Sequence, residues 1–298
     1  MTATFLDARW RAAHALAEPG AAQDKHQRGT VLVIGGSRFV PGALALTFEA
    51  AMRAGAGKVQ LATVESVALA LGVSLPEAGI AALPENEEGN IDPSAVDRLV
   101  PLIERADCVV MGCGIKGGCE EKWPVADLIG HLPENATAIV DAAALEAISD
   151  RPDLTRAIGR RLVMTPNHDE CALLMGATRS EIDADPADAA RHAASHFGAT
   201  IVLKDRDTII ADGSGLLTFV NEGTGLGIAG SGDVLAGIAG GLLAQGIDPP
   251  AAAGWAVWLH AHAGQAVARR IAPYGYLARE ILIEIPPLLA EARRALHG

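Results

Sequence analysis

The chain has 298 residues, 50% of them hydrophobic but only 4% aromatic, and its 24 basic and 36 acidic residues give a net charge of −12. The length suffices for one large α/β domain or two small ones, and the acidic balance argues against a surface that binds nucleic acid or an anionic membrane. No apolar run reaches membrane-spanning length, and the first apolar segment is unlike a signal peptide because it contains Asp7, Arg9 and Arg11. We therefore expect a cytoplasmic protein with neither membrane nor nucleic-acid partners.

Hydrophobic periodicity predicts an amphipathic helix over residues 4–18 and then alternating strands and helices. Strands are expected at 30–34, 58–64, 79–83, 108–111, 137–140 and 162–164, with helices at 42–54, 67–71 and 94–104. Closely spaced apolar runs predict an antiparallel meander at a sheet edge, at 200–203, 208–211 and 216–220. Three helices are expected to end the chain, at 233–245, 249–271 and 276–296.

Most of the predicted strands are continuous apolar runs, which is typical of a parallel sheet covered on both faces. No internal repeat or linker divides the chain, so residues 1–298 are expected to form one three-layer α/β/α domain. In such sheets, ligands bind outside the carboxyl ends of the strands. Glycines and polar residues follow four predicted strands at these ends: Gly35-Gly36-Ser37, Gly112-Cys113-Gly114, Asp141 and Thr165-Pro166-Asn167-His168.

Some residues at these strand ends have a structural interpretation beside the functional one. Asp141 could hold Mg²⁺ through water or cap the following helix. Asn167, with Glu170 three residues later, fits a capping box, and it could also face a ligand. The cysteines form no C-x-x-C pair, so free buried thiols are expected rather than a metal site: Cys108, Cys113, Cys119 and Cys171.

A glycine-rich run ends in Gly230-Ser231-Gly232-Asp233, directly before an apolar stretch that predicts a helix. The first N–H groups of a helix lack intrahelical partners and favour an anion, so a phosphate fits this place. Asp233 would repel a phosphate unless it takes a proton from a hydroxyl group that meets the phosphoryl group. The structural alternative is a tight turn with an acidic residue in the first helical turn.

The segment between two of the predicted strands is charged and reads Lys204-Asp205-Arg206-Asp207-Thr208. It predicts either a solvated hairpin turn or a clamp in which backbone N–H groups, Lys204 and Thr208 face a polyphosphate. Further along the chain, His260 and His262 are two residues apart on a predicted helix and cannot share a face. Helix packing is therefore favoured over a metal pair for these two histidines.

In their order and spacing, these motifs resemble the NAD(P)H-hydrate dehydratases of the ribokinase-like superfamily. The resemblance covers about residues 25–287 and rests on short segments at 29–37, 42–43, 54–57, 165–170, 202–208, 230–238, 260–264 and 276–278. It implies a ribokinase-like three-layer α/β/α sandwich with a central, mostly parallel sheet. It also implies an enzyme that restores NADH and NADPH from the S-epimer of their hydrates.

In that family, ADP or ATP phosphorylates the C6 hydroxyl of the hydrated nicotinamide ring, and phosphate then leaves; Mg²⁺ is the expected companion of the nucleotide. The resemblance implies that Asp233 is the base that deprotonates this hydroxyl. It also implies that Ala43, Gly114, Asn167 and Asp233 line the hydrate. The nucleotide would be held by Lys204, Asp205, Arg206, Asp207, Thr208, Gly230, Ser231 and Gly232.

The chain departs from the family pattern near the site. Asn167 and Asp205 stand where many bacterial members have His and Gly, and Asp141-Ala142-Ala143 lacks the second acidic residue of the usual Asp-Ala-Asp. These departures leave open a nucleotide-binding homologue with weakened catalysis. The anion site and Asp233 would equally serve a ribokinase-like kinase for a hydroxymethyl vitamin precursor or a sugar. A separate hydrate epimerase is the expected functional partner, and a homo-oligomer is expected through Ala-rich C-terminal helices.

Overall fold

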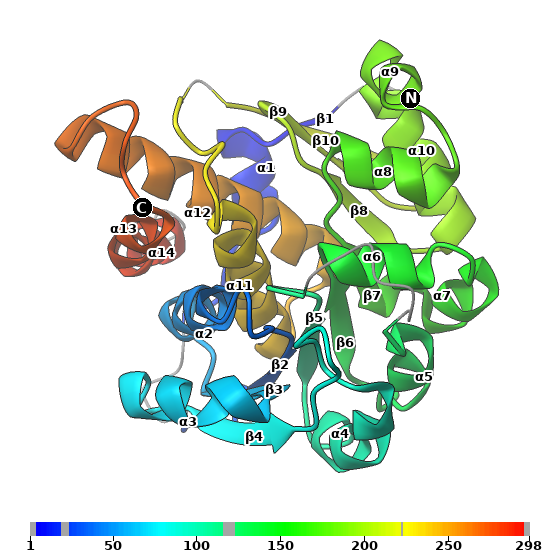
Figure 1. Ribbon diagram of the computed structural model, residues 1–298. Helices are drawn as coiled ribbons and strands as arrows, with labels where there is room; N and C mark the ends of the chain where they lie inside the picture. Colours follow the sequence, from blue (N-terminus) through cyan, green and yellow to red (C-terminus); the bar gives the residue numbers. More distant parts are fainter. Residues whose placement is uncertain (1–3, 19–23, 116–122, 222, 295–298) are drawn as a thin grey trace.

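The computed structural model describes residues 4–18, 24–115, 123–221 and 223–294 (Figure 1). Ten strands form one sheet in the order β1-β10-β9-β8-β7-β6-β5-β2-β3-β4. The pairs from β8 through β7, β6, β5, β2 and β3 to β4 are all parallel, whereas β8-β9 and β9-β10 are antiparallel. The strand bounds are β1 Thr4–Phe5, β2 Thr30–Ile34, β3 Lys58–Val64, β4 Gly79–Leu83, β5 Cys108–Met111, β6 Thr137–Val140, β7 Leu162–Met164, β8 Thr200–Leu203, β9 Asp207–Ala211 and β10 Leu216–Val220.

The expected mostly parallel α/β sheet is confirmed. Its central strands are continuous apolar runs because both faces of the sheet are buried. All four residues of β5 and all four of β8 are buried, as the continuous apolar runs predict. In Figure 1, α2 (Gly42–Arg53), α11 (Ser231–Ala244) and α12 (Pro249–Arg270) lie on one side of the sheet. Helices on the other side include α4 (Val96–Ile103), α5 (Val125–Gly130), α7 (Pro152–Ile158) and α10 (Pro186–Phe197).

The helices near the site complete the framework. Helix α8 (His168–Met175) follows β7, and α9 (Arg179–Ala184) follows α8. The remaining described helices are α1 (Ala8–Ala13), α3 (Glu65–Ser74), α6 (Ala143–Ile148), α13 (Ala278–Ile281) and α14 (Ile285–Arg294), with 3-10 turns at Pro93–Ala95, Gly159–Arg161 and Leu282–Glu284. Among the described helices, none combines the length and the apolar character that a bilayer crossing requires.

Both ends of the chain correct the sequence-based prediction. In place of one helix over 4–18, the structure has strand β1 (Thr4–Phe5) and the shorter helix α1 (Ala8–Ala13). Strand β1 pairs in parallel with β10, so β1 rather than β10 forms that edge of the sheet. The helix expected at 276–296 is divided into α13, a 3-10 turn and α14. These differences arise from long-range pairing and packing, which local periodicity does not encode.

The Ala-rich helix α12 serves the interior of this chain. Ala252, Ala253, Gly254 and Ala256 are buried within it, and a Cβ atom at Gly254 would approach Trp10 of α1 to 2.5 Å. The small side chains therefore allow close packing inside the chain. Because these small residues are buried inside the chain, they are not available for a subunit interface on α12.

Candidate active site

Polar residues gather at the carboxyl ends of neighbouring parallel strands, where the N-terminus of α11 also lies. A cavity of about 800 Å³ is lined there by Asp141 after β6, Asn167 after β7, Lys204 after β8, and Gly230 to Asp233 at the start of α11. Apolar side chains complete its wall, among them Phe219, Leu226, Ile228, Leu235 and Val257. A cavity of this size with a few convergent polar groups suits a small organic ligand such as a nucleotide.

Lys204, which lines this cavity, is held between two carboxylates. Its Nζ atom lies 2.7 Å from Asp141 Oδ1 and 3.6 Å from Glu170 Oε2. The Thr165 hydroxyl donates a second hydrogen bond of 2.7 Å to Asp141 Oδ1. Although burial alone would lower it, Asp141 and Glu170 raise the pKa of Lys204, so the ammonium group stays charged. Asp141 thus acts as a buried partner of Lys204 in this structure.

Asn167 and Glu170 form the capping box that the sequence predicts. The Asn167 side chain accepts a hydrogen bond of 2.9 Å from Glu170 N, and Glu170 accepts one of 2.7 Å from Asn167 N. Burial raises the pKa of Glu170, although the nearby Lys204 lowers it in part. Both residues also line the cavity, so the helix cap and the wall of the site are built from the same side chains.

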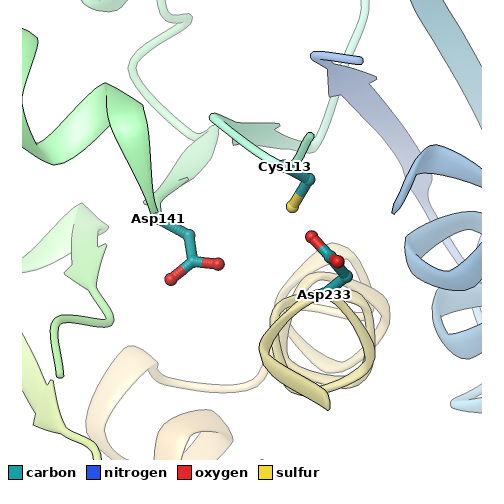
Figure 2. A group of neighbouring side chains, drawn as sticks. All are labelled: Cys113, Asp141 and Asp233. Carbon is teal, nitrogen blue, oxygen red and sulfur yellow. The ribbon is translucent and has the colours of Figure 1, made fainter. Parts of the chain in front are cut away.

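Asp233 faces the Cys113 thiol (Figure 2). Cys113 Sγ and one carboxylate oxygen each of Asp141 and Asp233 lie within 4.8 Å of one another. Burial, and then the charge of Asp141, raise the pKa of Asp233 to about 6, although the hydrogen bond from Cys113 lowers it in part. Burial likewise raises the pKa of the Cys113 thiol well above its ordinary value. Asp233 is therefore a carboxylate with increased basicity, suited to accept a proton near neutral pH.

The start of α11 is a tight turn whose backbone requires glycine. Gly230 has a φ of +88°, and a Cβ atom there would lie 2.5 Å from Leu46 Cδ1. The N–H groups of Gly232 and Asp233 belong to the first helical turn, where no intrahelical acceptor is available. At Gly232, a Cβ atom would sit 3.6 Å from Lys204 Nζ, so this backbone lies beside the only described lysine that lines the cavity. An anion bound at this N-terminus would meet the free N–H groups and the Lys204 ammonium group.

His260 of α12 belongs to the same cavity, which the sequence-based prediction of helix packing missed. Its Nε2 atom lies 3.0 Å from Ser231 Oγ, and the residue lines the cavity wall. Burial lowers the pKa of His260 to about 4, so the ring is neutral near pH 7. No local pattern could indicate this contact, because Ser231 and His260 lie on different helices. His262, by contrast, packs on Trp258 with ring centroids 4.1 Å apart, in accordance with the prediction.

The charged segment after β8 is a hairpin turn that also borders the cavity. The turn joins β8 to antiparallel β9, and Lys204 N donates a hydrogen bond of 2.8 Å to Pro166 O. Asp205, Arg206 and Thr208 line the cavity. Asp207 Oδ1 instead accepts a hydrogen bond of 3.3 Å from Asn221 N. The structure thus brings most of the expected nucleotide set together, with Asp207 turned toward the neighbouring strand.

The four residues expected at the hydrate are divided into two groups. Asn167 and Asp233 line the cavity, whereas Ala43, at the start of α2, is buried beneath Gly114. Gly114 has a φ of +70°, and a Cβ atom there would lie 2.7 Å from Ala43 Cβ. The two groups meet through Cys113, which precedes Gly114 and contacts Asp233. Residue Cys119 lies outside the described residues, and Cys108, Cys113 and Cys171 are free and buried as expected.

The chemistry of the donor atoms does not suit a resident Mg²⁺ ion. Magnesium prefers octahedral oxygen ligands, but the cluster of Cys113, Asp141 and Asp233 includes a protonated thiol. Asp141 Oδ1 is already engaged by Lys204 and Thr165. The alternative helix-capping role of Asp141 is also not observed, because α6 has no side-chain cap.

Comparison with known proteins agrees with this arrangement. A family model described as NAD(P)H-hydrate dehydratase matches residues 31–287. The chain belongs to the NAD(P)H-hydrate dehydratase family. One relative, the ADP-dependent (S)-NAD(P)H-hydrate dehydratase of Xanthomonas campestris pv. campestris, is 40% identical over 276 residues, which cover 91% of each chain. The chain spans about half the length of the family's bifunctional NAD(P)H-hydrate repair enzymes. The match to the Escherichia coli enzyme is 31% identical and covers 47% of that protein and 86% of this chain.

Solved structures with the same fold are found. The ADP/ATP-dependent NAD(P)H-hydrate dehydratase of Bacillus subtilis, co-crystallized with ATP and Mg²⁺, superposes with a TM-score of 0.80 at 26% identity. That match covers 98% of this chain and 99% of the other. A ribokinase-like superfamily protein of Enterococcus faecalis has a TM-score of 0.82 at 23% identity and covers 97% of this chain and 96% of its own. The ribokinase-like architecture is therefore confirmed.

Proposed function

We propose that this chain catalyses the nucleotide-dependent dehydration of the S-epimer of hydrated NADH and NADPH, which restores the reduced cofactor and releases phosphate. The observation that carries the proposal is Asp233, a partly buried carboxylate of raised pKa in the first turn of α11, in one cavity with Lys204. The names of the family relatives from Xanthomonas campestris and Bacillus subtilis support this substrate class.

The first step is transfer of the terminal phosphoryl group to the C6 hydroxyl of the hydrated ring. Asp233 takes the hydroxyl proton as the new P–O bond forms and the bond to the departing nucleotide breaks. The N–H groups of Gly232 and Asp233 and the Lys204 ammonium group stabilise the negative charge on the phosphoryl oxygens. In the second step, the C6–O bond breaks with help from the ring nitrogen, phosphate leaves, and loss of a neighbouring ring proton restores the reduced nicotinamide.

The remaining assignments extend this proposal to each expected contact. Asn167, Ala43 and Gly114 position the hydrate near Asp233. Lys204, Thr208 and the backbone from Gly230 to Gly232 hold the phosphates of ADP or ATP. Arg206 is a further cation at the cavity wall, whereas Asp205 and Asp207 shape the turn. Mg²⁺ would enter with the nucleotide and be held mainly by its phosphate oxygens, because the protein supplies few suitable ligands of its own.

The test is a turnover assay with the purified protein, hydrated NADH, and either ADP or ATP with Mg²⁺. We expect the absorbance of reduced nicotinamide to return together with free phosphate, with at least one of the two nucleotides. A stable phosphate ester as the final product would instead identify a ribokinase-like kinase. Nucleotide binding without turnover of the hydrate or of any other hydroxylated substrate would identify a homologue with weakened catalysis.

The cellular context is part of the same proposal. A cytoplasmic location agrees with the three free cysteines among the described residues. A separate epimerase that interconverts the two hydrate epimers would be the functional partner, since the family includes bifunctional repair enzymes. A homo-oligomer remains a prediction, which light scattering on the purified protein would test.

A further inference from the structure

His168 lies behind the nucleotide turn and contacts a carboxylate on each side. It is the first residue of α8, and its side chain is only 5% exposed. Its Nδ1 atom lies 2.5 Å from Asp183 Oδ1, and its Nε2 atom lies 3.6 Å from Asp205 Oδ2. Both neighbours are carboxylates and therefore acceptors, so the ring serves both contacts when each nitrogen carries a hydrogen and the imidazole is charged. Neither the capping box nor the proposed chemistry uses this ring.

The contact with Asp183 is firmly supported from the other side. Arg179 Nε donates to both carboxylate oxygens of Asp183, at 2.9 and 3.1 Å, and its Nη1 atom donates to Asp169 at 2.8 Å. The hydrogen bond from His168, followed by that from Arg179, lowers the pKa of Asp183, so Asp183 remains an ionised acceptor. The imidazole ring is thus fixed from α9, and its second nitrogen has a defined position next to the turn.

The contact with Asp205 continues a connection that the backbone begins. Lys204 N donates to Pro166 O at 2.8 Å, and Asn167 and Lys204 form an isolated parallel bridge. His168 and Asp205 are the next residues of the two segments, and here the side chains make the contact. Asp205 lines the cavity, whereas among the described residues His168 lies outside its lining. The ring therefore contacts the carboxylate from behind the cavity wall.

A free carboxylate at this position would oppose nucleotide binding. Asp205 directly follows Lys204, the cation expected to meet the phosphates, and its side chain is 55% exposed. A negative charge that could swing toward a diphosphate would repel it, most strongly where the site is shielded from water. We propose that His168 is a positioning residue that holds the Asp205 carboxylate away from the path of the ADP or ATP phosphates, an inference that rests on the proposed nucleotide site.

The proposal predicts a rescue that simple packing does not. His168→Leu fills the space of the ring but removes both nitrogens, and we expect the Kd for ADP with Mg²⁺ to rise about tenfold. Adding Asp205→Asn to this variant removes the released charge and should return the Kd to within about threefold of the original. The matched control is Asp183→Asn in the same background, which removes a charge on the far side of the ring and should restore nothing.

Isothermal titration calorimetry with ADP, and separately with ATP, measures these affinities without the hydrate. The proposal is overturned if His168→Leu leaves both affinities unchanged, if Asp205→Asn fails to rescue, or if Asp183→Asn rescues equally. Where His168→Leu does not fold, His168→Asn replaces it with the same expected pattern, because its amide lies near the position of Nδ1 and it has no polar atom at the position of Nε2. In turnover assays, the loss should appear in the KM for nucleotide, with kcat within about twofold. Wild-type protein that binds nucleotide but does not turn over the hydrate refutes the proposed function and leaves this test intact.

Discussion

Two regions of the cavity each supply a buried or largely buried carboxylate, and the two carboxylates have opposite surroundings. At the end of β6, Asp141 is only 4% exposed, and it is matched by Lys204 at 2.7 Å and by the Thr165 hydroxyl. At the start of α11, Asp233 faces a thiol, and burial raises its pKa to about 6. A carboxylate that is paired with a cation keeps its charge and stabilises that cation. A desolvated carboxylate without such an ion pair binds a proton more readily. Under the proposed function, Asp141 therefore has a structural role and Asp233 transfers the proton.

The largest expected effect is the loss of turnover in Asp233→Asn. The amide has nearly the same shape but cannot accept the hydroxyl proton, so kcat should fall by a factor of about 10²–10⁴. Steady-state assays of phosphate release and circular dichroism of the variant measure the rate and the fold. Asp97→Asn is the matched control, since Asp97 is an exposed acidic residue in the first turn of α4. Similar losses in both variants would contradict the assignment.

The next effect concerns stability and should be confined to the other carboxylate. Asp141→Ala leaves the Lys204 ammonium group largely buried with only Glu170 at 3.6 Å. We expect the free energy of unfolding to fall by about 2–4 kcal/mol, measured by urea denaturation. Asp248→Ala, which breaks the exposed pair with Arg160, should cost less than about 0.5 kcal/mol. Equal costs would show that Asp141 is not the partner that stabilises Lys204.

The pH dependence of turnover tests the basicity of Asp233. A base is active in its deprotonated form, so kcat/KM should rise about tenfold per pH unit on the acidic side and level off as the base ionises. The bend is expected near pH 6, where Asp233 ionises in the folded protein. Phosphate release across this range measures the profile. A profile that is flat between about pH 5 and 8 would exclude Asp233 as the base.

The smallest effect is a gain in stability that accompanies the loss of activity in Asp233→Asn. The pKa of Asp233 is about 6 in the folded chain, above its ordinary value of 3.8, so ionisation of this group opposes folding. That penalty is fully present above about pH 6, and it disappears as the pH falls below the ordinary value. At pH 8 the free energy of unfolding of the variant should exceed that of the unaltered protein by about 1–3 kcal/mol, and at pH 3.5 the two should be equal. A destabilised variant at pH 8 would contradict the account.

The sequence predicts the strands and the strand-end positions well because both depend on local patterns. The continuous apolar run of Cys108–Met111 becomes β5 with the expected bounds, and the Asn167–Glu170 capping box forms as the spacing predicts. The partners of the site residues are not predictable in this way. Lys204 meets Asp141 across 63 positions of the chain, and Ser231 meets His260 across 29. Such contacts depend on sheet order and helix packing, and neither is encoded in a local motif.

The central claim is that Asp233 starts a phosphoryl transfer whose phosphate is then expelled. The most direct measurement is a single-turnover experiment with hydrated NADH and nucleotide labelled in its terminal phosphate, on the unaltered protein and on Asp233→Asn. We predict that labelled inorganic phosphate and reduced nicotinamide appear in equal amounts with the unaltered protein. We also predict that Asp233→Asn binds the nucleotide but forms neither product. Equal product formation by the variant, or reduced nicotinamide without labelled phosphate, would contradict the account.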